Sequence, residues 1–199
     1  MTVSIAELEA RPRLHLGFDD HGRELSDEEY RNAAFDVPWR YELLDGRLSV
    51  MPPCGQGHVE REQPWLRRLF AYSDQRPDLV EFVVPEAWVM IHDGRYRIGD
   101  LGVYLHGDRS NTPIPDRVPE LMVEIVSPGR TSHDRDYQEK KVDYFQAGVL
   151  EYVIVDPIAW RVQVLTRGET GYVERVLKAG ETYTTPLLPG LEVVLNEVL

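Results

Sequence analysis

The chain has 199 residues, of which 42% are hydrophobic and 28% charged, and its formal net charge is −12. This composition is typical of a folded domain and argues against an intrinsically disordered chain. No apolar run approaches the roughly 20 residues that a membrane helix needs, and the first residues lack the basic start and apolar core of a signal peptide. We therefore expect a cytoplasmic protein without membrane contact.

Two features of the composition bear on function. The single cysteine, Cys54, excludes an internal disulfide and argues against a cysteine-based zinc site. The acidic balance disfavours tight non-specific binding to DNA, because neutralisation of phosphates by basic residues supplies much of that affinity. It is compatible with a metal-dependent nuclease, in which carboxylates gather around the metal.

The N-terminal region predicts an arm followed by one domain. Residues 1–25 are polar and weakly periodic, so we expect an N-terminal arm there and a single domain over residues 26–199. Ser26 and Glu29 have the spacing of a capping box, which predicts the start of a short helix.

A hairpin and a longer helix follow. Residues 41–44 and 47–51 flank Asp45-Gly46, a two-residue turn signal typical of a β-hairpin. The apolar spacing over residues 58–73 predicts a helix, which Pro64 should kink or mark as a first turn.

The remainder of the chain alternates strands with one helix. We expect a helix over residues 132–147, ended by Gly148. Strands are expected over residues 82–91, 96–105, 121–126, 152–155, 161–166, 172–177 and 191–195. This order predicts an α/β fold with a mixed sheet flanked by helices, an added N-terminal hairpin and added C-terminal strands.

Glu124 is the only charged residue in the apolar run of residues 121–126. A run of this kind indicates a strand buried on both faces. An ionised carboxylate there costs several kcal/mol unless it is paired or binds a metal. The alternative is a solvated face of an edge strand, although Met122 and Val126 make the face of Glu124 apolar.

Asp100 has a similar context in the strand over residues 96–105. It shares one strand face with Gly102, whose missing side chain leaves space beside the carboxylate. The alternative is an aspartate that only stabilises the strand entrance after Gly99.

Lys141 falls on a stripe of helical spacing with Tyr137, Tyr144 and Phe145, which predicts that it faces the sheet. It could then meet the carboxylates, or its stem could lie on the apolar surface while the ammonium reaches water. Two carboxylates and an ammonium suit phosphodiester hydrolysis, since carboxylates hold Mg²⁺ and the ammonium assists the nucleophile.

Several motifs in this order resemble one bacterial family. They are YELLDG at residues 41–46, GDLGV at 99–103, VEIVSP at 123–128, Lys141, EYVIVDP at 151–157 and PLLPGL at 186–191. The chain is similar over about residues 25–199 to the bacterial putative restriction endonucleases of the PD-(D/E)XK nuclease superfamily, which are abundant in cyanobacteria and green non-sulfur bacteria.

The resemblance implies a restriction-endonuclease-like fold, DNA as substrate and a homodimer. It also implies a Mg²⁺ or Mn²⁺ site held by Asp100, Glu124 and Glu42, with Lys141 as the catalytic lysine. The superfamily's usual lysine position, two residues after the glutamate, is Val126 in this chain. Gly99 stands where the family usually has proline, which alters backbone stiffness and no ligand.

Two weaker candidates could contact the substrate, namely His58 and Arg130, although a histidine at a helix end is more often structural. Two other functions stay open. A catalytically silent module that binds nucleic acid or protein with the same fold would fit the acidic charge. A hydrolase using Glu42 and Glu124 as an acid/base pair would leave an inward lysine without a role.

Overall fold

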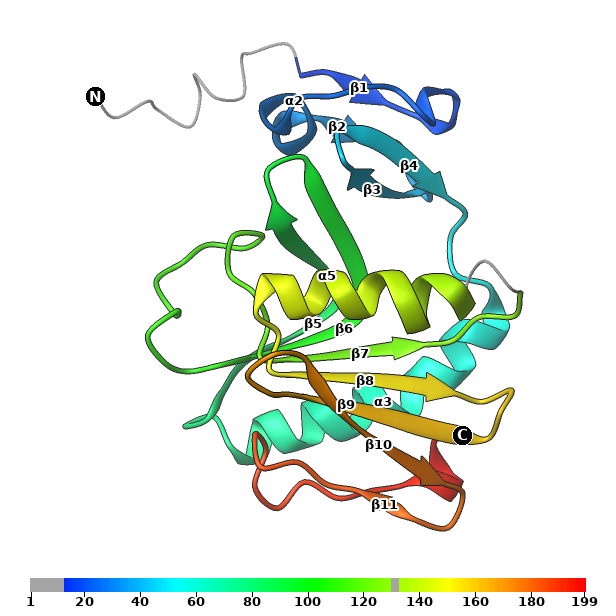
Figure 1. The fold of residues 1–199 in the computed structure, drawn as a ribbon, viewed down its shortest axis with the longest axis vertical. Coiled ribbons are helices and arrows are strands. Elements are labelled where there is room, and N and C mark those ends of the chain that lie inside the picture. The colour runs from blue at the N-terminus through cyan, green and yellow to red at the C-terminus, as the bar shows by residue number, and fades with distance from the viewer. Residues whose placement is uncertain (1–12, 130–132) are drawn as a thin grey trace. The chain divides into compact units, whose positions relative to one another are not determined.

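The computed structural model describes residues 13–129 and 133–199 (Figure 1). They fall into two compact units, of which the first contains the described residues up to Pro53 and Asp93–Arg95, and the second contains Cys54–His92 and the described residues from Tyr96 to Leu199. Residues 1–12 of the expected N-terminal arm lie outside the described residues. In the parts of the chain that the structure describes, no helix is both long and apolar enough to cross a membrane.

The first unit contains the predicted capped helix and hairpin. In α2 (Asp27–Asn32), the Ser26 hydroxyl accepts the Glu29 backbone N–H and the Glu29 carboxylate accepts that of Ser26. Asp45 and Gly46 take φ values of 52° and 79°, as the predicted tight turn requires. The strands of the unit are β1 (His15–Leu16), β2 (Ala34–Phe35), β3 (Arg40–Leu44) and β4 (Arg47–Met51), with η1 (Phe18–Asp20) between the first two.

The second unit is built on a mixed sheet in the order β10-β9-β8-β7-β6, with β5 also paired to β6. Its strand β7 runs antiparallel to β6 and parallel to β8, and all five of its residues are buried. The strands are β5 (Val80–His92), β6 (Arg95–Leu105), β7 (Leu121–Ile125), β8 (Glu151–Asp156), β9 (Arg161–Arg167) and β10 (Tyr172–Lys178). The predicted α/β fold with a mixed sheet is therefore confirmed.

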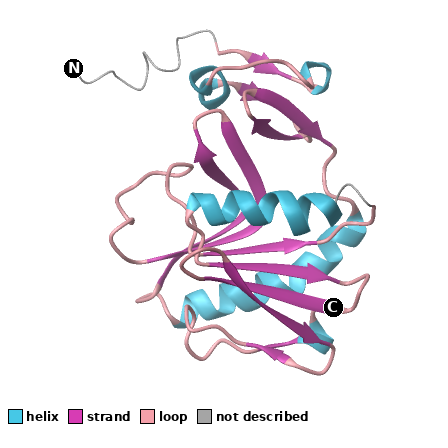
Figure 2. Ribbon diagram, in the orientation of Figure 1, coloured by secondary structure: helices cyan, strands magenta, loops and turns pink. Residues whose placement is uncertain are grey.

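Helices cover both faces of this sheet (Figures 1 and 2). Trp65 and Leu69 of α3 (Gln56–Gln75) pack against Leu121 and Val123 on one face. Tyr144 of α5 (Lys140–Ala147) packs against the other face, in a cluster with Met122, Val126 and Ile154. Successive side chains of each central strand belong to these two clusters in turn, because they point to opposite faces of the sheet.

Three local expectations need correction. Pro64 lies well inside α3 and does not mark its first turn. The helix expected from residue 132 begins outside the described residues and includes a π-helical turn, η2 (Arg135–Glu139), directly before α5. The strand expected over residues 191–195 shortens to β12 (Val193–Val194), paired with β11 (Thr182–Tyr183) and followed by η3 (Leu195–Glu197).

Candidate functional site

Asp100 and Glu124 lie on neighbouring strands at the centre of the second unit. The antiparallel register pairs Leu101 with Val123, and its next step brings Asp100 opposite Glu124. The Ile125 backbone N–H donates to Oδ2 of Asp100 at 2.8 Å. Glu124 is 2% exposed and Asp100 is 4% exposed. Residues directly opposite on paired strands share a face, so the two carboxylates share the face that α5 covers.

Lys140, and not Lys141, reaches Glu124. Its Nζ donates to Oε1 of Glu124 at 2.7 Å and to the Ile98 carbonyl at 2.9 Å. Lys140 is 2% exposed. The expected contact of Lys141 with the two carboxylates is corrected, because its partly exposed ammonium forms an ion pair with Glu174 on the edge strand β10.

The charged character of the buried helix face explains this error. Asp136, Lys140 and Asp143 are all buried here, whereas Tyr144 is the only fully buried member of the predicted stripe. The burial of Asp143 is compensated by Arg97, whose Nε donates to Oδ2 at 2.6 Å. The π-helical turn before Lys140 also changes the phase of the helix, since π turns contain more residues than α turns. The apolar stripe of this helix therefore selects Lys141, whereas the buried lysine is Lys140.

The buried site gathers three carboxylates, those of Asp100, Glu124 and Asp136. Burial, together with the nearby carboxylates of Asp100 and Asp136, raises the pKa of Glu124 to about 7, although Lys140 opposes the shift. Burial also raises the pKa of Asp136. Lys140 and the Tyr144 hydroxyl both donate to the same oxygen, Oε1 of Glu124.

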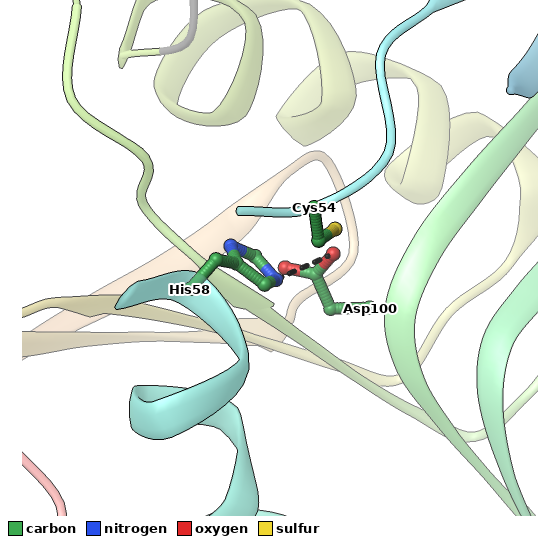
Figure 3. A group of neighbouring side chains, drawn as sticks. All are labelled: Cys54, His58 and Asp100. Atoms are coloured by element: carbon green, nitrogen blue, oxygen red, sulfur yellow. Dashed lines mark ion pairs between the residues drawn. The ribbon is translucent and has the colours of Figure 1, made fainter. Parts of the chain in front are cut away.

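A second group of side chains adjoins Asp100. Cys54, in the loop before α3, and His58, in its first turn, point toward the Asp100 carboxylate (Figure 3). One donor atom from each of the three lies within 4.8 Å of the others, so the group could hold a metal ion. The spacing of Cys54 and His58, four residues apart at a helix start, is a signal that the sequence already contains.

His58 is 9% exposed, and its Nε2 lies 3.4 Å from Oδ1 of Asp100 without the alignment of a hydrogen bond. Its Nδ1 lies 3.1 Å from Oγ of Ser127. Burial alone would lower the pKa of His58, but Asp100 and Cys54 together raise it to about 10. Without a metal, the histidine is therefore a cation paired with Asp100 at neutral pH.

Two other residues predicted from the sequence, Glu42 and Arg130, do not belong to the groups described above. Glu42 is buried on β3 of the first unit, opposite Ser49. Arg130 lies outside the described residues.

A cavity of about 490 Å³ opens beside Ser127, just after the end of β7, and its lining includes His133, Asp156 and Arg161. This cavity supplies basic and apolar surface within one residue of the strand that carries Glu124.

With this geometry in place, the comparisons with known proteins identify the family. Residues 27–196 match the family described as "Uma2: Putative restriction endonuclease". The chain belongs to this family. Among curated proteins, none matches the Uma2 chain described here.

A solved structure supports the fold of this Uma2 protein. It is a crystal structure of "a putative nuclease belonging to DUF820" from Anabaena variabilis, with 12% sequence identity and a TM-score of 0.69. The match covers 87% of this chain and 97% of that chain. At this identity, the likeness establishes a shared architecture, and the chemistry must be argued from the side chains.

Proposed function

We propose that this Uma2 protein is a metal-dependent endonuclease that hydrolyses DNA phosphodiester bonds. One observation carries the proposal: the buried contact between Lys140 and Glu124 lies on the same sheet face as Asp100. Membership of a family described as restriction endonucleases supports the reaction class. Buried charge of this kind is costly for stability, and such arrangements cluster at functional sites.

Asp100 and Glu124 would hold the metal, Mg²⁺ or Mn²⁺. The residues fit such an ion, because carboxylate oxygens are the ligands that these hard cations prefer, and burial together with the neighbouring carboxylates raises the pKa of Glu124, a shift that a bound cation would oppose. Glu42 stays a predicted ligand from the sequence. When bound, the ion would polarise a phosphoryl oxygen and lower the pKa of a coordinated water.

Lys140 takes the role that the sequence assigned to Lys141. Its hydrogen bonds to Glu124 and to the Ile98 carbonyl fix the position of the ammonium. A fixed, buried positive charge stabilises negative charge that develops on the phosphate in the transition state. His58 acts as a positioning residue, since its ring lies against Asp100 and Ser127.

DNA is the proposed substrate, and the cavity beside Ser127 is the proposed place for the nucleotide next to the scissile phosphate. His133 and Arg161 of its lining would contact phosphate, and Arg130 stays a predicted contact. The net charge of −12 implies weak non-specific DNA binding that weakens further with added salt. A homodimer and a cytoplasmic location stay predictions.

The test compares variants on several DNA substrates. Purified protein is incubated with supercoiled plasmid and with short branched or single-stranded DNA, with Mg²⁺, with Mn²⁺ or with a chelator. We expect metal-dependent cleavage by the wild type and by Lys141→Ala. Glu124→Ala, Asp100→Ala and Lys140→Ala should lose at least 100-fold in rate. Equal cleavage by wild type and Glu124→Ala would refute this site.

The acidic charge favours one alternative, a catalytically silent module that binds nucleic acid or protein. That reading predicts no divalent-metal affinity at Asp100 and Glu124. Calorimetry with Mn²⁺ separates the two, because heat of binding that disappears in Asp100→Asn supports the nuclease. Its absence in the wild type supports the silent module.

A further inference from the structure

Cys54, His58 and Asp100 bring three different donor types to one point. A thiol comes from the loop before α3, an imidazole from the first turn of α3 and a carboxylate from β6 (Figure 3). Their donor atoms lie within 4.8 Å of one another. The nuclease proposed above uses only one of the three as a metal ligand.

The imidazole nitrogen that faces this point has no hydrogen-bond partner. Nε2 of His58 is buried and forms no hydrogen bond with the described residues, and its nearest charged neighbours are Oδ1 of Asp100 at 3.4 Å and Oε2 of Glu62 at 3.9 Å. A buried polar atom without a hydrogen-bond partner lowers the stability of the folded state. Such an atom in a native structure indicates an interaction that the protein atoms do not supply.

The other ring nitrogen is already engaged, as in histidines that bind metals. Nδ1 lies 3.1 Å from Oγ of Ser127, which can accept its proton. Histidine ligands usually donate their second ring N–H to an oxygen in this way, which aims the lone pair of the first nitrogen at the metal. In His58 that nitrogen faces Asp100, and a metal ion between the two would take the place of the proton that joins them in the metal-free protein.

The spacing agrees with a tetrahedral metal. Bonds of about 2.0–2.1 Å at a tetrahedral angle separate a nitrogen and an oxygen ligand by about 3.3–3.4 Å. Nε2 of His58 and Oδ1 of Asp100 are 3.4 Å apart. The sulfur of the half-exposed Cys54 lies within 4.8 Å of a donor atom of each of these two residues, and zinc–sulfur bonds are longer, at about 2.3 Å.

We propose that Cys54, His58 and Asp100 form a site for Zn²⁺ or a similar transition metal. A thiolate and an imidazole select such ions over Mg²⁺, which prefers oxygen ligands. The cysteine count argues only against sites made of several thiolates, whereas this mixed set requires one. Because Asp100 would serve both sites, Zn²⁺ should compete with Mg²⁺, a consequence that rests on the proposed nuclease function.

Cobalt provides a test that is independent of activity. Co²⁺ is titrated into the purified full-length protein, and the absorption spectrum is recorded. We expect one equivalent to produce a thiolate-to-cobalt charge-transfer band and the strong visible bands of tetrahedral Co²⁺, and Zn²⁺ to abolish both. Cys54→Ser is the matched control, since it removes the thiolate and keeps the size of the side chain.

Cys54→Ser should lose the charge-transfer band, and both Cys54→Ser and His58→Gln should bind Zn²⁺ at least tenfold more weakly by calorimetry. Circular dichroism checks that each variant is folded. No cobalt band in the wild type, or the same band in Cys54→Ser, would overturn the site.

Cleavage assays then separate this inference from the nuclease proposal. In the wild type, Zn²⁺ should inhibit Mg²⁺-dependent cleavage, and inhibition of Cys54→Ser should need at least tenfold more Zn²⁺. If no protein cleaves DNA but the cobalt band depends on Cys54, the metal site stands and the nuclease proposal fails. Equal inhibition of both proteins would overturn the proposed competition at Asp100.

Discussion

Lys140 and Glu124 form a buried ion pair between α5 and β7, with Nζ and Oε1 2.7 Å apart and both side chains 2% exposed. The pair is embedded in a region where Asp100 and Asp136 add negative charge. Arg135 lies 3.1 Å from Asp136 and His58 lies 3.4 Å from Asp100, so the stability of the folded chain depends on how each buried carboxylate is matched by a cation or a proton.

Replacing Lys140 should destabilise the protein far more than replacing its neighbour. Lys140→Met leaves the buried carboxylate of Glu124 without its cation, a change that typically costs about 3–5 kcal/mol. The loss should be largest at pH 8 and smaller at pH 6, where Glu124 can take up a proton. Urea denaturation at both pH values measures the effect.

Lys141→Met is the matched control for this experiment. Its ion pair with Glu174 is partly exposed, and exposed pairs contribute about 0–1 kcal/mol. A loss of stability in Lys141→Met equal to that in Lys140→Met would contradict the assignment of Lys140 as the buried lysine.

The metal-free protein should lose stability as the pH rises through the titration of Glu124. The pKa of Glu124 is about 7 in the folded chain against an ordinary 4.5, so between these values the folded state holds a proton that the unfolded state has released. The free energy of unfolding therefore falls from about pH 4.5 to about pH 7, by on the order of 2–3 kcal/mol from this group.

Glu124→Gln isolates that contribution, because the amide keeps an acceptor for Lys140 and does not titrate. Urea denaturation in the presence of a chelator, at pH 5 and pH 7.5, compares the two proteins. Other groups shift both curves, so the difference between the proteins is the decisive quantity. Parallel curves would mean that Glu124 has no raised pKa.

Divalent metal should stabilise the protein more at pH 8 than at pH 6. Protons and the cation compete for Glu124, so the metal binds more weakly where the carboxyl is protonated. With Mg²⁺ or Mn²⁺ at 100 times its Kd, the expected gain is about 2.7 kcal/mol, or roughly 5–10 °C in Tm. Differential scanning calorimetry at the two pH values measures it.

Asp100→Asn should abolish this gain, whereas Glu174→Gln, which removes an exposed carboxylate, should keep it. The control matters in a chain with a net charge of −12, because such a chain collects cations non-specifically. Equal gains in the two variants would show that the stabilisation comes from general screening and not from Asp100.

Gly99→Ala should disturb the site by steric contact. A Cβ at Gly99 would lie 2.9 Å from the Tyr144 hydroxyl and closer still to the Met122 side chain. Met122 can adapt, but Tyr144 donates a 2.6 Å hydrogen bond to Glu124 and cannot move without breaking it. We expect a loss of about 1–3 kcal/mol in thermal or urea unfolding.

Gly171→Ala provides the comparison, because a Cβ there meets no atom within 4 Å. Its effect should stay within about 0.5 kcal/mol. If Gly99→Ala proves as harmless as Gly171→Ala, the close packing of Tyr144 against β6 is not what limits this position.

The positions of the two carboxylates could be predicted from local patterns. Alternation along residues 121–126 indicates that Glu124 shares its face with Met122 and Val126, and all three are buried. The neighbouring residues alone are enough to show that a charged Glu124 is unusual in this apolar run. The same holds for the capping box at Ser26 and the turn at Asp45-Gly46, since their signals lie within four residues.

The tertiary structure decided two features of the site. One is that Lys140 is the buried lysine, and the other is that Cys54 and His58 lie beside Asp100. A search for an apolar stripe assumes that a helix buries its apolar side chains, but this helix buries Asp136, Lys140 and Asp143. Their charges are compensated by residues distant in sequence, such as Arg97 and Glu124. The sequence alone determined the order of the elements and the acidic residues of the sheet, because these depend on local periodicity. Only the tertiary structure showed which charged side chains pair, because the free-energy cost of burying each one depends on a partner that is distant in the sequence.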